Sequence, residues 1–247
     1  MRPPSSLRGM LGLPGAVLVL CLASVAFGWL QLRAQTRAVE LERLDRRADA
    51  FAVKVAERLR AYEQVLRGAA ALFAVSPEVT RAQWHAYMRT QGLARTYPGI
   101  LAVGYVSVVP AAKLAAHEAA VRREGFASYR VHPDTPRDVY LPIHYVDPFE
   151  GRNLRAFGYD MTTEPVRREA IERARDSGAA TLSGRVSLLQ DDSERKVPGF
   201  LLYVPLFRDG VDPGSVSARR ERFVGMVYMA YFAADMFSNL VDTDSDG

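Results

Sequence analysis

The feature that most constrains this chain is an uncharged, apolar run near its amino terminus. Residues 11–32, LGLPGAVLVLCLASVAFGWLQL, contain no charged side chain. A helix of about 20 apolar residues spans the ~30 Å hydrocarbon core of a bilayer. A cleaved signal peptide is the alternative, since Arg2 and Arg8 resemble its basic leader, but the run exceeds the usual length and lacks a small-residue cleavage site before Gln35. We therefore expect a transmembrane helix at 11–32, preceded by a short leader at 1–10.

Charge and cysteine content exclude several classes of protein. The net charge is +4 over 247 residues, and the arginines are interspersed with acidic residues rather than gathered in a basic block. Nucleic-acid binding is therefore not expected. The single cysteine, Cys21, lies inside the apolar run, so residues 33 onward can form neither a disulfide nor a thiolate metal site. Lysine and arginine counts on the two flanks of the run leave the membrane orientation open.

A helical pattern follows the apolar run. Between residues 36 and 73, apolar side chains from Leu44 to Phe73 recur at spacings of three and four, which forms a heptad-like seam. Two interpretations stay open at this point: one long helix packed on its own domain, or a parallel dimer stalk. We assign residues 33–75 to this long stalk or dimerisation helix.

The rest of the chain alternates helical and strand patterns. Thr80 and Gln83 form a capping box that predicts a helix ending at Gly92, and a further helix is expected at 111–124. Thr162 or Thr163 is expected to cap a third helix that ends at Gly178. The segments with strand composition are 100–109, 129–132, 140–146, 181–190, 200–207 and 223–232. This order predicts an α+β fold with a mostly antiparallel sheet and flanking helices.

An ordered set of motifs resembles one family of sensory domains. The matching pieces are YPGI (97–100), Gly104-Tyr105, Gly125-Phe126, Tyr140-x-Pro142, Tyr145-x-x-Pro148, Asn153, Gly158-Tyr159-Asp160, Glu164-Pro165, Arg168 and the runs ERARDSG, TLSGRVSLLQ and GFLLYVPLF. Over roughly residues 75–235 the chain resembles the CHASE family, the extracytoplasmic sensory domains found ahead of histidine kinases and nucleotide cyclases.

The resemblance implies an architecture and a location. It implies an amino-terminal anchor in the bacterial inner membrane, a cytoplasmic leader at 1–10, and a periplasmic part from residue 33 onward. It also implies two PAS-like modules, of which only the membrane-distal one binds a small molecule. We therefore expect a CHASE-like sensory domain at 76–235, and we expect 236–247 to begin a truncated segment that leads to a second membrane helix. The output domain would be a histidine kinase or a diguanylate cyclase, and a homodimer would form through the stalk helix.

The resemblance also suggests a ligand site beside the third helix. Plant members of the family grip an adenine-type hormone with a carboxylate at the position that corresponds to Arg167, so the reversed charge here favours an anionic ligand over a purine. A helix arginine that points to solvent is the simpler alternative. The ligand-binding candidates chosen by their match to the family pattern are Tyr140, Tyr145, Tyr159, Met161, Arg167, Ser183, Arg185, Leu189 and Leu202.

Other polar residues are assigned structural roles or none. Asp160, Glu164 and Arg168 are expected to hold the strand–helix junction, and no nucleophile–base pair suggests catalysis. His144 lies in a candidate pocket strand, as a ligand contact or as an ordinary core histidine. The four histidines have no metal-site spacing, and the acidic motif of Asp242, Asp244 and Asp246 ends before the glutamate that a calcium loop needs, so no metal or cofactor is expected. The alternatives to a sensor are a dimerisation module without a ligand and a periplasmic enzyme.

Overall fold

The computed structural model describes residues 12–76, 78–97, 99–191 and 197–236. Helix α2 (Gly12–Val75) begins this part of the chain, and the predicted helix at 36–73 is confirmed as part of it. The chain divides into two units between Lys54 and Val55, within this helix. The predicted membrane span starts at Leu11, outside the described residues. Among the residues that the structure describes, no helix combines the length and the hydropathy needed to cross a membrane.

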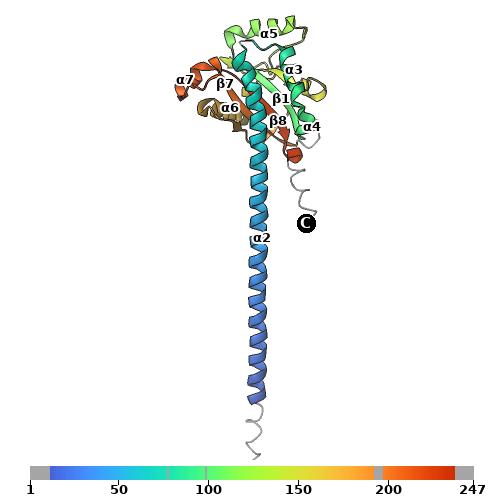
Figure 1. The fold of residues 1–247 in the computed structure, drawn as a ribbon, viewed down its shortest axis with the longest axis vertical. Helices are drawn as coiled ribbons and strands as arrows, with labels where there is room; N and C mark the ends of the chain where they lie inside the picture. Colours follow the sequence, from blue (N-terminus) through green and yellow to red (C-terminus); the bar gives the residue numbers. More distant parts are fainter. Residues whose placement is uncertain (1–11, 77, 98, 192–196, 237–247) are drawn as a thin grey trace, which may run out of the picture. The chain divides into compact units, whose positions relative to one another are not determined.

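The second unit contains a mixed set of helices and strands (Figure 1). Its helices after α2 are α3 (Arg81–Gln91), α4 (Leu93–Thr96), α5 (Leu114–Arg123), α6 (Pro165–Ser177) and α7 (Val216–Arg222). Its strands are β1 (Ile100–Ser107), β2 (Val109–Pro110), β3 (Val139–Tyr140), β4 (Ile143–Asp147), β5 (Thr181–Leu182), β6 (Val186–Ser187), β7 (Pro198–Phe207) and β8 (Phe223–Phe232). Short 3-10 turns are η1 (Ala111–Lys113), η2 (Gly151–Ala156), η3 (Met161–Thr163) and η4 (Arg208–Gly210).

The strands form one large antiparallel sheet and a small ribbon. The sheet has the order β4-β1-β8-β7-β5, with β6 also paired to β7, and the ribbon joins β2 to β3. Every pairing between these strands is antiparallel. The α+β class and the antiparallel sheet are therefore confirmed for the described residues. The predicted tandem arrangement of two PAS-like modules stays a prediction.

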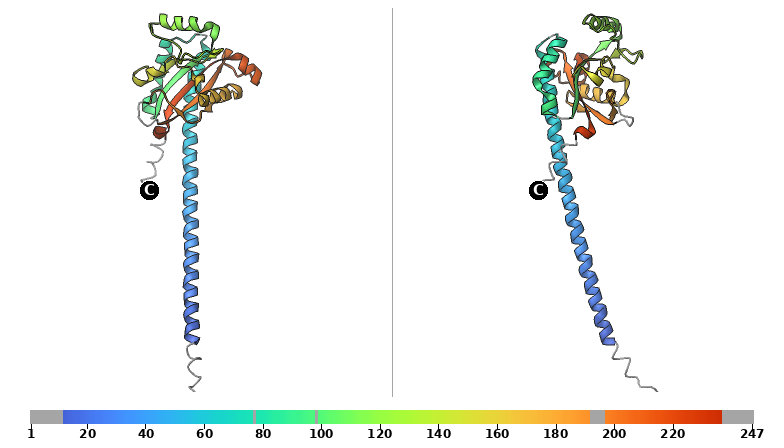
Figure 2. Two further views of the ribbon diagram at one scale, coloured as in Figure 1. Left: turned by 180° about the vertical axis from the view of Figure 1, so that it is seen from behind. Right: turned by 90° about the vertical axis from the view of Figure 1, so that its right-hand side faces the viewer.

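The sheet separates two apolar cores. On one face, α6 packs against Ala102, Val106 and Tyr228. On the other face, the part of α2 from Val55 onward and helix α3 pack against neighbouring strand residues such as Val103 and Val227. The side view in Figure 2 shows helices on both sides of the sheet. Since side chains alternate across a strand, neighbouring residues of β1 enter different cores.

Helix boundaries follow the capping chemistry. At α3 both halves of the Thr80–Gln83 capping box are present, and Gly92 ends the helix in the left-handed conformation, as predicted. At α6 the prediction of a Thr162 or Thr163 cap is wrong. Glu164 is the N-cap, because its carboxylate accepts hydrogen bonds from the Val166 and Arg167 amides at 3.0 and 2.8 Å.

The strand predictions hold best in the centre of the sheet. β8 coincides with the predicted 223–232, whereas the predicted strand at 129–132 is absent: His132 makes a single bridge to the loop at Tyr159 instead of joining the sheet. The predicted strands at 140–146 and 181–190 are each divided into two pieces, β3 and β4, and β5 and β6. Pro142 lies between β3 and β4, and it has no amide hydrogen to donate to a continuous ladder. Residues 192–196, between β6 and β7, lie outside the described residues.

Candidate functional site

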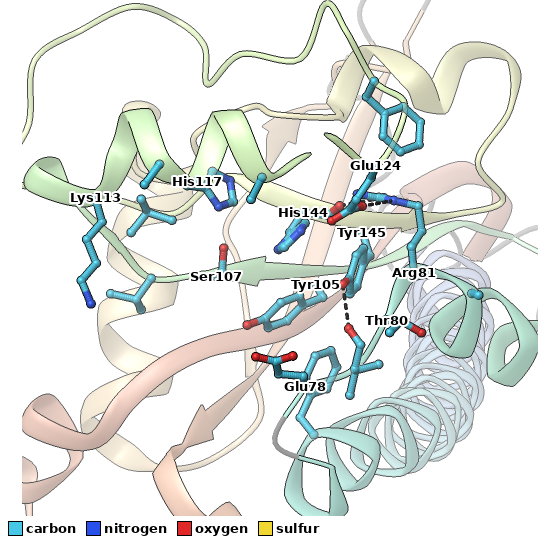
Figure 3. Close-up of a pocket in the computed structure, with 18 of the residues that line it drawn as sticks. Glu78, Thr80, Arg81, Tyr105, Ser107, Lys113, His117, Glu124, His144 and Tyr145 are labelled. Atoms are coloured by element: carbon cyan, nitrogen blue, oxygen red, sulfur yellow. Dashed lines mark hydrogen bonds and ion pairs between the residues drawn. The ribbon is translucent and has the colours of Figure 1, made fainter. Parts of the chain in front are cut away.

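A hollow of about 1080 Å³ opens on the α2 face of the sheet, where four segments of the chain meet. Its walls come from the last turn of α2 with the 78–82 segment, from the ends of β1 and β2, from helix α5, and from strand β4. Figure 3 shows the side chains that line it. Cavities of this size and mostly apolar lining are typical of small-molecule sites.

Aromatic side chains form the wall nearest to α2. The ring of Phe73, in the last turn of α2, stacks on Tyr105 of β1 with centroids 4.3 Å apart. The Tyr145 hydroxyl donates to the Val79 carbonyl at 2.7 Å, and burial raises the pKa of this hydroxyl. The hydrogen bond therefore ties strand β4 to the connection between α2 and α3.

Arg81 is the most strongly held charged group of the hollow. Its Nε donates to Glu124 at 3.0 Å, and its Nη1 donates to the His144 carbonyl at 3.0 Å. Its guanidinium carbon lies 4.6 Å from the ring centroid of Phe126 and 4.8 Å from that of Tyr145. The side chain is only 12% exposed. Pairing and ring stacking fix the guanidinium in place.

Two histidines lie opposite each other beside Ser107. The rings of His117, on α5, and His144, on β4, are 5.1 Å apart at their centroids and nearly perpendicular. His117 Nε2 is 2.9 Å from the Tyr129 hydroxyl. Burial lowers the pKa of both histidines, and for His144 the value falls to about 3, with His117 and Arg81 as further causes. Both rings are therefore neutral at pH 7.

The depressed pKa of His144 predicts a loss of stability in acid. Between the folded value of about 3 and the ordinary 6.5, the unfolded chain binds a proton that the folded chain does not, so the contribution is fully present above 6.5 and is lost as the pH falls toward 3. We expect His144→Gln to flatten the pH dependence of the unfolding free energy by up to about 1.4 kcal/mol per pH unit in this window. Urea unfolding from pH 7.5 to 4 measures this, with His132→Gln as the matched control. Equal slopes for the wild type and His144→Gln would contradict the prediction.

The structure places Arg167 away from this hollow. The side chain is 3% exposed in the α6 core, so the solvent-facing alternative is wrong. Its Nη2 donates to the Ser187 carbonyl at 2.8 Å, its Nη1 lies 3.4 Å from the Met161 sulfur, and its guanidinium lies 5.1 Å from the Tyr159 ring centroid. Three of the predicted ligand residues, Tyr159, Met161 and Arg167, therefore do meet in a packed cluster, in which protein groups contact both terminal nitrogens of Arg167 and its Nε is buried without a hydrogen-bond partner.

The remaining predicted residues are dispersed. Of the nine candidates, Tyr145 lines the hollow. Tyr140 packs beneath α5, and Leu202 is buried in the core on the α2 face. Ser183 is buried and bonded to backbone groups of Gly184 and Leu201, and Arg185 is exposed. Leu189 packs against the α6 core.

The junction residues make local contacts. Asp160 is fully buried and accepts hydrogen bonds from the Leu141 amide and from the Thr162 amide and hydroxyl, at 2.8 to 3.0 Å. Glu164 caps α6, and Arg168 is half-buried beside Asp138 and Glu172 in a smaller hollow of about 480 Å³. These contacts support the chain where it enters α6.

Most polar residues of the hollow were missed by sequence reasoning. No sequence motif singles them out, because their spacing along the chain follows no pattern typical of a site. These residues are Arg81, Ser107, Lys113, His117 and Glu124. His144 is the exception: the sequence indicates it as a possible ligand contact, because it lies in a strand expected to line a pocket. Within the described part of the chain, no group of three or more histidine, cysteine or acidic side chains is arranged to hold a metal ion. The acidic motif at 242–246 lies outside the described residues.

Comparison with known proteins identifies a family model and two solved structures. A model described as the CHASE domain matches residues 77–247. An extracellular ligand binding receptor from Desulfohalobium retbaense DSM5692 shares 14% identity at a TM-score of 0.44, over 76% of this chain and 25% of that one. The ligand binding domain of the Pseudomonas aeruginosa PAO1 amino acid chemoreceptor PctC, solved in complex with GABA, shares 11% identity at a TM-score of 0.42, over 80% of this chain and 63% of that one. The chain thus spans less than two thirds of either structure. No curated protein sequence matches it.

Proposed function

Because this chain belongs to the CHASE domain family, we propose that it is the extracytoplasmic small-molecule sensory input of a membrane-bound signalling receptor. The observation that carries the proposal is the hollow of about 1080 Å³, in which neutral histidines, a fixed arginine and aromatic rings surround one space. A mostly apolar cavity with a few polar groups is the expected form of a ligand site.

The proposed signal passes through the end of α2. Phe73 belongs to α2, and Glu78 and Val79 belong to the connection that follows it, so a ligand in the hollow touches both. A ligand that binds one arrangement of these residues more tightly than another shifts their populations, by no more than its difference in affinity for the two. Helix α2 and a following membrane helix would carry this shift to a histidine kinase or a diguanylate cyclase.

Membrane attachment and pairing of two chains are further parts of the proposal. The large apolar side chains described between Val17 and Leu32 are exposed on α2, which suits contact with lipid. The part of the heptad-like seam before Val55, which begins at the exposed Leu44, suits a homodimer through α2, whereas Tyr62, Leu66 and Ala69 of the same seam are buried in the core of their own domain. Under this proposal the ligand site lies in the periplasm of a bacterial inner-membrane receptor.

The proposal predicts ligand-dependent stability that depends on the hollow. Thermal unfolding of the purified chain against a library of anionic, cationic and neutral metabolites should show a binder, and at 100 times its dissociation constant a ligand adds ~2.7 kcal/mol. Ala116 of α5 lines the hollow, and Ala119 of the same helix is not among its lining residues, while both are exposed. We expect Ala116→Trp to abolish the shift and Ala119→Trp to retain it.

The same experiment separates the alternatives. A shift that survives Ala116→Trp but is lost in Arg167→Ala would move the ligand site to the α6 core, as the sequence alone predicted. No shift with any compound would favour a dimerisation module, whereas turnover of a compound would favour an enzyme. Each of these results would contradict the proposed site or the proposed function.

A further inference from the structure

We infer that the hollow on the α2 face recognises a small organic carboxylate through Arg81, Ser107 and His144. This inference rests on the proposed function, because it names the ligand class of the same site. Its starting point is a set of buried polar atoms. Arg81 Nη2, Ser107 Oγ and His144 Nε2 are buried and have no hydrogen-bond partner among the described residues, and all three side chains line this hollow. Buried polar atoms without a partner are rare in folded proteins, and each lowers stability by about 1–3 kcal/mol.

The three atoms share one chemical property, which is that each can donate a hydrogen bond. A guanidinium nitrogen only donates, a serine hydroxyl donates or accepts, and a neutral histidine donates from Nε2 in one of its tautomers. A carboxylate has two oxygens with about four acceptor positions, so its acceptor capacity matches a set of three donors. A cationic group would bring further donors toward Arg81 and would leave Arg81 Nη2 unpaired, because a guanidinium nitrogen only donates.

The contacts of Arg81 leave one part of its guanidinium available. Nε faces Glu124 and Nη1 faces the His144 carbonyl, so Nη2 remains for a ligand. Phe157 adds a third ring at 4.9 Å from the guanidinium carbon, beside Phe126 and Tyr145. Because this geometry is already fixed in the protein, little rotamer freedom is lost when a ligand binds.

The charges around the hollow are compatible with an anion. Glu124 is paired to Arg81 and is 38% exposed at its side chain, toward the edge of the site. Lys113 and Glu78 carry opposite charges, are both exposed, and belong to different segments of the chain that line the hollow. Figure 3 shows His117 projecting from α5 toward Ser107 and His144, so the ring of His117 closes this polar end of the hollow. The charge-assisted bonds to a carboxylate are stronger than bonds to a neutral acceptor.

The rest of the lining defines the body of the ligand. Phe73, Tyr105 and Val109 present apolar surface beside the polar end. A carboxylate with a short aromatic or aliphatic body therefore matches both parts of the hollow. The inferred anion coincides in charge with the one favoured from Arg167, but the residues that bind it are different.

The test compares two probes that differ in charge and not in shape. Phenylacetate and phenylacetamide are titrated into the purified full chain at pH 7, and binding is followed by saturation-transfer NMR. We expect phenylacetate to bind at least tenfold more tightly than phenylacetamide. We expect Ser107→Ala, which removes one orphaned hydroxyl, to weaken phenylacetate about tenfold or more, since a hydrogen bond to a charged group contributes about 1.5–3 kcal/mol. Ser217→Ala, an exposed serine of α7, is the matched control.

A second variant keeps the test independent of any one substitution. Arg81→Gln removes the charge and should abolish the preference for phenylacetate over phenylacetamide, whereas Arg168→Gln, in the smaller hollow, should retain it. Equal binding of the two probes by the wild type would overturn the carboxylate inference and leave the hollow as a site for neutral ligands. Binding of phenylacetate that is insensitive to both Ser107→Ala and Arg81→Gln would also overturn it. Failure of both probes at millimolar concentration would overturn the inference, while the metabolite library decides the proposed function separately.

Discussion

Replacing Gly104 by alanine is expected to destabilise the sensory domain strongly. Gly104 lies in the middle of β1, paired with Val146 of β4 on one side and Tyr228 of β8 on the other. An added Cβ would overlap the Tyr228 ring and would lie 2.6 Å from the Tyr145 carbonyl oxygen. The ring is fully buried, and the carbonyl belongs to a strand, so neither group can yield without moving the sheet.

The expected loss for Gly104→Ala is about 3 kcal/mol, at the upper end of the ~1–3 kcal/mol typical of overpacking, because both a buried ring and a strand carbonyl would have to move. In a domain of this size the midpoint of thermal unfolding should fall by about 6–12 °C. Gly28→Ala is the control, because a Cβ there meets no atom within 4 Å, and it should leave the midpoint unchanged. A loss below about 1 kcal/mol would show that Tyr228 has room to turn aside.

The second large effect concerns the buried carboxylate that precedes α6. Asp160→Ala would leave the buried Leu141 amide without its acceptor and would remove the ion pair with Arg137, whose Nε lies 3.3 Å from Asp160 Oδ2. An unsatisfied buried donor and a broken buried ion pair together should reduce the unfolding free energy by about 3–5 kcal/mol. Urea unfolding of the purified chain measures this loss.

Matched variants distinguish the hydrogen bonds of Asp160 from its charge. Asp160→Asn keeps an acceptor oxygen for the Leu141 and Thr162 amides, so it should lose less than Asp160→Ala. Asp138→Ala removes an exposed carboxylate from the neighbouring segment and should have little effect. If Asp160→Ala were as stable as the wild type but failed to bind the ligand, Asp160 would belong to the ligand site rather than to the junction.

Local structure could be predicted from the sequence where short-range chemistry decides it. The Thr80–Gln83 capping box, Gly92 and Gly178 each act within one or two helical turns, and each is found at the predicted helix end. The strand at 223–232 could also be predicted from the sequence. It forms β8, which lies between β1 and β7, and its residues are buried on both faces. Such a strand has a continuous apolar sequence that no loop resembles.

The incorrect predictions concern residues whose partners are distant in the chain. The segment 129–132 has the composition of a strand, yet Tyr129 and Val131 pack beneath α5 and His132 bonds with the loop at 158–160. At the start of α6, two threonines and a glutamate were all able to cap, and the backbone turn at Met161–Thr163 decided in favour of Glu164. Propensity ranks such options, and tertiary context selects among them.

The candidate site was the least predictable part. The hollow assembles residues as far apart in the chain as Phe73 and Tyr145, and no local pattern brings together Arg81, Ser107 and His144. Tyr145 was chosen because it matched a family motif. Arg167 matches the family pattern in the same way, and the sequence does not show that the Ser187 carbonyl and the Met161 sulfur contact two of its guanidinium nitrogens while the third, Nε, has no hydrogen-bond partner.

The division of the domain into two cores by one sheet has a consequence for how such a receptor diversifies. In β1, Ala102 and Val106 serve the α6 core, whereas Val103 and Tyr105 lie on the face that carries the hollow. Substitutions on the two faces share few contacts, so their effects on stability should be nearly additive. Under the proposed function, a lineage can therefore replace the chemistry of the hollow, and acquire a new stimulus, while the α6 side preserves the fold unchanged.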